Sequence, residues 1–156
     1  MNNRHFKAEK ITKTATITIN GNINKVFPLF GAFEERKWAK GWNPTLLFPS
    51  TEIIEEGSTF RTDGDGNIEK EFIWRVSKYE HENYLIQYLV STENRYWTIT
   101  IKCDSISDKQ TKAMITYTFI GLNELGNKIN SHLLEKMYIN NLKDWQDPIN
   151  YYLDNN

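Results

Sequence analysis

The sequence predicts an α+β fold in which a curved antiparallel β-sheet wraps around a long C-terminal helix. Three observations predict it: one strand pattern opens the chain, a short helical pair rich in Trp and Phe follows, and a run of strands leads to one closing helix. A chain of 156 residues fits a single domain, residues 1–156, and no stretch has the composition of a linker. We expect such a fold to surround an apolar cavity.

The first expected elements are a strand and two short helices. Residues 14–19 alternate Thr with Ala or Ile, and these mostly β-branched residues favour a strand. Asn22 can cap the helix that follows, and Pro28 limits that helix to one or two turns. Gly31 separates a second short helix, which we expect over residues 32–40.

From Thr51 onward the hydrophobic period becomes two, which predicts a run of strands. We expect these strands over residues 52–56, 59–62, 68–79, 84–92, 95–103 and 111–122. Residues 46–49 are expected to form a loop or an edge segment. Because the strands are consecutive and the turns between them are short, the sheet should be an antiparallel meander.

A closing helix is expected from residue 124 or 127 to the C-terminus. Apolar residues recur there at three- and four-residue steps from Leu134 to Tyr152, which is typical of a helix face that packs on a core. Pro148 should kink this helix or separate its last turns, because it removes a backbone donor from the helix interior.

The charge and the single cysteine restrict the partners and the compartment. Nineteen Lys and Arg against 20 Asp and Glu give a net charge of −1, which provides no general attraction to nucleic acid or an anionic membrane. Cys103 is the only cysteine, so no internal disulfide can form. Residues 1–10 are polar and lack an apolar export core, and no segment approaches the length of a membrane span. We therefore expect a cytoplasmic protein.

Three passages carry a resemblance to a known superfamily through their order and spacing. In residues 17–30 a strand ends in Asn-Gly-Asn before a helix. Residues 38–44 read Trp-Ala-Lys-Gly-Trp-Asn-Pro and are followed by Gly-Ser-Thr-Phe at 57–60. The third passage is the strand at 115–122, before the long helix that holds Trp145. Together they resemble the START/polyketide-cyclase (SRPBCC) superfamily, whose helix-grip fold is shared with the birch-pollen allergens.

The resemblance implies a helix-grip fold with a seven-stranded curved antiparallel sheet around the C-terminal helix and two short helices after the first strand. It also implies a cavity for lipids, hormones, polyketides or other apolar molecules. It does not imply one activity, because members include carriers, receptors, cyclases and activators of a chaperone ATPase.

Aromatic residues from several elements are the candidates for the walls of such a cavity. Trp38 and Trp42 would flank its mouth, strand residues would lie inside it, and Trp145 would face them from the helix. The predicted ligand-binding residues are Trp38, Trp42, Phe60, Trp74, Tyr88, Trp97, Tyr117, Met137, Asn141 and Trp145. The alternative interpretation is a filled aromatic core that stabilises a chain poor in aliphatic residues.

Polar residues within apolar runs are candidates for orienting a ligand. Asn141 is the best placed, because Met137 and Trp145 lie four residues to either side of it on the predicted helix. Arg75 alternates with the apolar residues of its strand, so it is expected to point outward. Four carboxylates near strand ends are expected on the hairpin surface: Glu55, Glu56, Glu69 and Glu71.

No motif for a metal, a cofactor or catalysis accompanies these residues. The three histidines do not cluster in the sequence, and no Gly-x-Ser-x-Gly motif occurs. Asp63, Asp65 and Asn67 imitate a calcium loop but lack its central Gly and its final Glu. We therefore predict no metal and no cofactor.

The sequence favours a non-enzymatic protein that carries or senses a small apolar or amphipathic molecule. One alternative is a polyketide cyclase- or dehydratase-like enzyme, which would need an inward acid or base, and none stands out. The other alternative is a co-chaperone-type interaction module, which predicts no significant cavity. A homodimer is compatible with the sequence.

Overall fold

The computed structural model contains a seven-stranded antiparallel sheet, as predicted. The structure describes residues 5–156, so the first four residues of the polar N-terminal segment lie outside the described part. The strand order is β1-β7-β6-β5-β4-β3-β2, which is a meander from β2 to β7 with β1 paired to β7. The strands are β1 (Lys10–Ile19), β2 (Thr45–Phe48), β3 (Thr59–Asp63), β4 (Glu71–Glu80), β5 (Leu85–Ser91), β6 (Arg95–Ser107) and β7 (Gln110–Gly121), with a short helical turn η3 (His81–Asn83) between β4 and β5.

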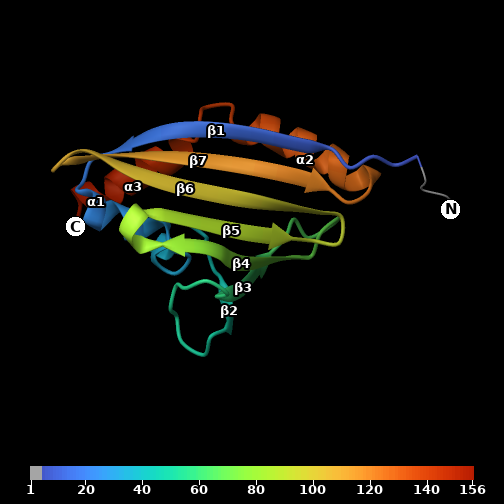
Figure 1. Ribbon diagram of the computed structural model, residues 1–156, viewed down its shortest axis with the longest axis horizontal. Coiled ribbons are helices and arrows are strands. Elements are labelled where there is room, and N and C mark those ends of the chain that lie inside the picture. Colours follow the sequence, from blue (N-terminus) through green and yellow to red (C-terminus); the bar gives the residue numbers. More distant parts are fainter. Residues whose placement is uncertain (1–4) are drawn as a thin grey trace.

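Two helices, rather than one, close the fold. α2 (Glu124–Met137) and α3 (Lys143–Asp154) lie behind β7 and β1 in Figure 1. Between them Asn141 and Leu142 have positive φ angles of 54° and 60°, which a right-handed helix cannot accommodate. Asn tolerates this conformation, and Leu142 buries its side chain there. The C-terminal segment is helical, as predicted, but it is broken into two helices, and the break precedes Pro148, which lies inside α3.

The segment after β1 forms two short helical pieces. The Asn22 side chain accepts a backbone hydrogen bond of 2.9 Å and caps α1 (Ile23–Val26), as predicted. The chain then tightens into the 3₁₀ turn η1 (Phe27–Phe30), where Pro28 lacks a backbone donor. The second predicted helix is reduced to the 3₁₀ turn η2 (Glu34–Lys37). In Figure 1, α1 lies near the C-terminus at one end of the sheet.

The edge of the sheet differs from the prediction. β2 (Thr45–Phe48) pairs with β3, whereas residues 52–56, which we predicted as a strand, form a loop between these two strands. The Ser58 hydroxyl donates to the Ile53 carbonyl oxygen at 2.8 Å and fixes this loop. Backbone groups that bond within the loop in this way are not available to a sheet neighbour.

The core lies between the sheet and the helices, on the face that the period-two pattern predicts. Ile86, Tyr88 and Val90 of β5 are buried, while the residues between them are half-buried. Arg75 of β4 is exposed, which confirms its outward direction.

A buried ion pair connects the turn before β4 to the start of β6. The Arg95 guanidinium donates to Glu69 at 2.7 Å, donates to the Asn130 side-chain oxygen on α2 at 3.2 Å, and lies 4.3 Å from the centre of the Trp97 ring. The expectation that Glu69 lies on the hairpin surface is wrong. The Asp65 side chain accepts the backbone N–H of Glu69 at 2.9 Å, which curls the turn and lets the Glu69 carboxylate enter the interior.

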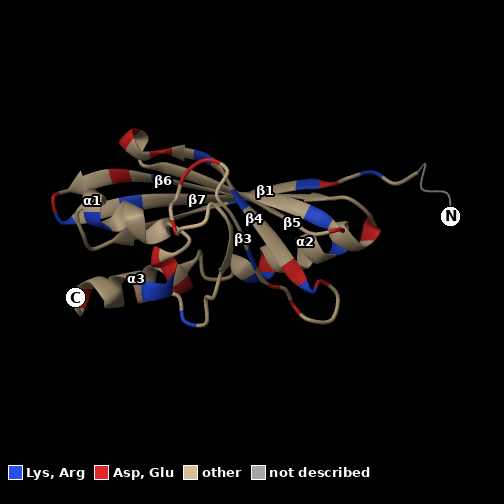
Figure 2. Ribbon diagram, turned by 90° about the horizontal axis from the view of Figure 1, so that it is seen from below, with Lys and Arg blue, Asp and Glu red and all other residues tan. Residues whose placement is uncertain are grey.

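Charged residues of both signs are mixed along the strands and helices (Figure 2). No helix within residues 5–156 is long and apolar enough to cross a membrane.

Candidate functional site

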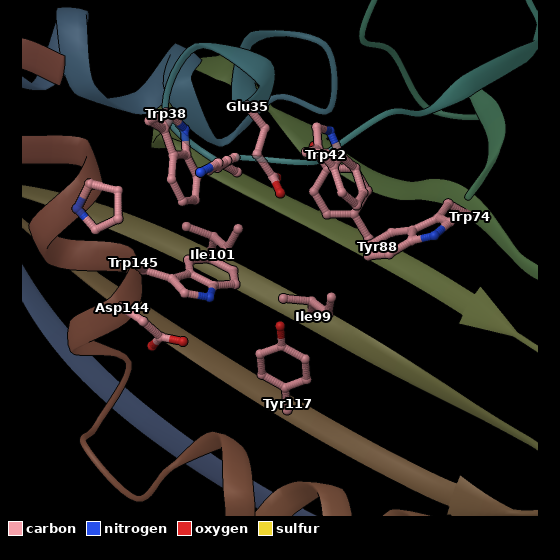
Figure 3. Close-up of a pocket in the computed structure, with 13 residues that line it drawn as sticks. Glu35, Trp38, Trp42, Trp74, Tyr88, Ile99, Ile101, Tyr117, Asp144 and Trp145 are labelled. Atoms are coloured by element: carbon pink, nitrogen blue, oxygen red, sulfur yellow. The ribbon is translucent and has the colours of Figure 1, made fainter. Parts of the chain in front are cut away.

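A cavity of about 510 Å³ lies between the sheet, the segment that contains η2, and the start of α3. Its volume is within the range of about 300–1,000 Å³ that is usual for small-molecule sites. Thirteen residues line it: Glu35, Trp38, Ala39, Lys40, Trp42, Trp74, Tyr88, Ile99, Ile101, Tyr117, Asp144, Trp145 and Pro148. Figure 3 shows these side chains converging from the sheet, from η2 and from α3.

The structure brings six of the ten predicted residues around this cavity. The six are all aromatic: Trp38, Trp42, Trp74, Tyr88, Tyr117 and Trp145. The strand members of the set occupy inward positions of β4, β5 and β7, and Trp145 follows the N-terminus of α3. The period-two pattern of the strands was sufficient to predict the strand members, because successive side chains of a strand point to opposite faces.

Three predicted residues are packed beside the cavity rather than in it. Phe60 is fully buried, and its ring stacks on Trp74 at 5.4 Å between centroids. Trp97 packs against both the Arg95 guanidinium and the Phe119 ring, and it lies two residues along β6 from the cavity residue Ile99. Met137 packs on the core at the end of α2. The cavity occupies one part of the inner face, and strand positions two residues apart are separated by about 6.8 Å.

Asn141 does not line the cavity, contrary to the position expected from helical spacing. Its side chain is exposed, and its backbone lies in the left-handed turn between α2 and α3. The helical spacing that linked Asn141 to Met137 and Trp145 does not exist, because no helix runs through this position.

Glu35 lines the cavity, although the sequence pattern does not predict it there. Glu35 lies in a charged run between Glu34 and Arg36, and such a run is typical of a surface exposed to solvent. The signal that could have found it is its spacing from Trp38 and Ala39, which lie three and four residues later and share its side of a helical turn. Figure 3 shows its carboxyl group between Trp38 and Trp42, directed into the cavity.

Hydrogen bonds to neighbouring atoms fix much of the aromatic wall. The Trp38 and Trp42 indole N–H groups donate to the carbonyl oxygens of Leu29 and Ala32 at 2.7 and 2.6 Å. The Tyr88 hydroxyl donates to a backbone carbonyl of η1 at 2.7 Å. These bonds tie the wall to η1 and the residues after it, so the cavity has a largely preformed shape.

Two polar groups in the cavity have no such partner. Within residues 5–156, neither the Glu35 carboxyl nor the Tyr117 hydroxyl forms a side-chain hydrogen bond, and both point into the cavity in Figure 3. Burial raises the pKa of Glu35 to about 8, because desolvation disfavours the charged carboxylate. Burial, followed by the influence of Glu35, raises the pKa of Tyr117 well above 10. Both groups are therefore mainly protonated at neutral pH and can donate a hydrogen bond to a ligand.

The described chain offers no evident metal centre. Among residues 5–156, no group of three or more His, Cys, Asp or Glu side chains has the arrangement of a metal site.

Comparisons with known proteins identify the fold. No protein-family model and no curated protein matches the sequence. Norcoclaurine synthase from Thalictrum flavum, solved with dopamine and hydroxybenzaldehyde, superposes with a TM-score of 0.71 at 10% identity, covering 95% of this chain and 88% of the synthase. Ara h 8.0201 gives a TM-score of 0.66 at 14% identity, covering 95% of this chain and all of that chain, 100%.

A protein from Thermobifida fusca, solved by NMR, gives a TM-score of 0.65 at 14% identity, covering 90% of this chain and 92% of that chain. Likeness at these identities concerns the fold, and one fold hosts many activities. The described chain therefore has the fold of these solved structures, which is the predicted helix-grip fold.

Proposed function

We propose that this protein binds a small aromatic or amphipathic molecule in the cavity between the sheet and α3, as a carrier or a sensor. The observation that carries the proposal is the cavity of about 510 Å³ with six aromatic walls and two unpartnered polar groups, Glu35 and Tyr117. A filled core would pair such groups, because buried polar atoms without partners are unfavourable.

A solved structure of the same fold supports this proposal. The Thalictrum flavum norcoclaurine synthase was solved with dopamine and hydroxybenzaldehyde, which are both single-ring aromatic molecules. Molecules of that size fit within the volume of this cavity, and Trp or Tyr rings provide large apolar contact areas for them.

Glu35 gives the enzyme alternative a specific candidate residue. An acid with a pKa of about 8 inside a cavity suits general acid–base chemistry near neutral pH. We keep a cyclase- or dehydratase-like activity as the second candidate, with Glu35 as its acid. The volume of the cavity argues against the co-chaperone-type module. The homodimer and the cytoplasmic location stay predictions.

Binding can be tested with the neutral apolar fluorophore N-phenyl-1-naphthylamine, together with native mass spectrometry of freshly purified protein. Ala39→Phe should fill the cavity without removing a core residue, and it should weaken probe binding by about tenfold or more, since one excluded ring removes roughly 1.4 kcal/mol or more of contact. Ala8→Phe adds the same ring at an exposed position and should bind like the wild type. Equal binding by the wild type and Ala39→Phe, or no binding by the wild type, would refute the proposal.

A further inference from the structure

Two carboxylates border the cavity from opposite sides. Glu35 enters it from η2, and Asp144 lies on its rim at the start of α3, next to Trp145 (Figure 3). Within residues 5–156, neither carboxylate takes part in a salt bridge. Lys40 is the basic residue of the lining and is exposed, and it is not among the causes of the raised pKa of Glu35. The lining therefore holds two carboxyl groups, of which Glu35 is protonated at neutral pH, and one exposed basic group.

The aromatic walls offer ring faces and edges around these acids. Trp38 and Trp145 lie 5.8 Å apart between ring centroids and are tilted to one another, and Trp42 meets Trp74 edge-to-face at 5.2 Å. The negative faces of indole and phenol rings attract cations, most strongly where water is excluded. The aromatic rings and the carboxyl groups therefore both favour a cationic ligand.

We propose that the cavity takes an arylalkylamine in its ammonium form, with its ring among the tryptophans and its N–H groups donating to Glu35. This inference rests on the proposed function and specifies the ligand class of the same site. On binding, the O–H bond of the Glu35 carboxylic acid breaks, the proton passes to solvent, and the resulting carboxylate accepts the hydrogen bond of the ammonium group. One proton is released for each cation that enters.

The titratable groups around Glu35 support this exchange. Tyr88 and Tyr117 face it from the sheet, Lys40 lies on its own segment and Asp144 on α3. Burial raises the pKa of both tyrosines well above 10, so they stay neutral. Burial brings the pKa of Glu35 to about 8, so the free protein holds its proton at neutral pH. A bound cation lowers that pKa, and the apparent affinity should therefore rise with pH up to about 8 and then level off.

Calorimetric titration with 2-phenylethylamine and its neutral analogue 2-phenylethanol tests the inference. The amine stays protonated below pH 9, because alkylammonium groups titrate near lysine, at about 10.4. We expect the amine to bind at least about tenfold more tightly than the alcohol at pH 8, since a charge-assisted hydrogen bond contributes about 1.5 kcal/mol or more. Its affinity should rise by up to about tenfold per pH unit between pH 6 and 8. Repeating the titration in two buffers of different ionisation enthalpy should show proton release.

Two variants separate Glu35 from a general charge effect. Glu35→Gln should remove both the preference for the amine and its pH dependence. Glu34→Gln removes the neighbouring carboxylate, which forms a surface ion pair with Lys37, and should behave like the wild type. Equal or tighter binding of the alcohol, or a pH dependence that survives in Glu35→Gln, would overturn the inference. If either result is found but N-phenyl-1-naphthylamine still binds, the proposed binding function is retained and only the inference about the amine is rejected.

Discussion

The Arg95 guanidinium donates to the Glu69 carboxylate at 2.7 Å, and each of these side chains is 1% exposed. The pair connects β6 to the turn before β4, and through Asn130 it reaches α2. Glu69→Ala leaves the Arg95 charge buried without its partner, so we expect the free energy of unfolding to fall by about 3–5 kcal/mol. Urea denaturation measures this. Glu71→Ala removes an exposed carboxylate two residues later and should change stability by less than about 0.5 kcal/mol. Similar stabilities of the two variants would contradict the prediction.

The stability of the protein should depend on pH through Glu35. The folded protein keeps the Glu35 proton up to a pKa of about 8, whereas the unfolded chain releases it near 4.5. The folded state therefore binds more protons between these values, and stability should fall as pH rises, by up to roughly 1.4 kcal/mol per pH unit, and then level off. Denaturation of the wild type and Glu35→Gln at pH 5, 7 and 9 measures this. Parallel profiles for the two proteins would contradict it, and Glu34→Gln should follow the wild type.

Trp97 and Trp145 should separate stability from binding. Trp97 is buried beside Arg95 and away from the cavity, so Trp97→Ala should lower the free energy of unfolding by about 3–5 kcal/mol. It should leave the affinity for N-phenyl-1-naphthylamine unchanged in the fraction that is folded. Trp145→Ala removes a half-buried cavity wall, so it should weaken probe binding with a smaller loss of stability. The opposite ranking in either measurement would show that the cavity is assigned to the wrong residues.

Gly126 should not tolerate alanine, although it lies inside a helix. A Cβ atom there would lie 1.9 Å from the carbonyl oxygen of Asn94, on the turn before β6. Gly→Ala usually stabilises a helix by about 1 kcal/mol, but this contact reverses the sign, and we expect a loss of roughly 1–3 kcal/mol. Thermal and urea denaturation measure the change. Ser131→Ala, at an exposed position of the same helix, is the control and should be nearly neutral. A Gly126→Ala variant that is more stable than the wild type would refute the close approach of Gly126 to the Asn94 carbonyl oxygen.

Cys103 should be unreactive in the folded protein. Its side chain is fully buried, and burial raises the pKa of its thiol to about 12, so very little thiolate is present at pH 8. We expect Ellman's reagent to label it slowly in buffer and rapidly in concentrated urea. Fast labelling of the native protein would show that β6 opens locally.

The inner face of the sheet could be predicted from the sequence, whereas the ends of the cavity could not. Tyr88 and Tyr117 occupy inward positions because alternation within a strand is a local property of the backbone. Helical spacing predicts Asn141 in the cavity, but a turn that no Gly or Pro marks interrupts the helix at this position. The burial of Leu142 stabilises that turn, which is a tertiary effect. Glu35 was missed for the same kind of reason, since its burial depends on the sheet and α3 and not on its charged neighbours.

The left-handed turn at Asn141 and Leu142 divides the C-terminal segment into α2, which packs on the sheet, and α3, which also lines the cavity. α2 is held to the sheet by the Arg95–Asn130 hydrogen bond and by the close approach at Gly126, so it is constrained as scaffold. α3 supplies the cavity with Asp144, Trp145 and Pro148. Substitutions at Asp144 or Trp145 can therefore change the cavity lining while the contacts of α2 with the sheet stay intact.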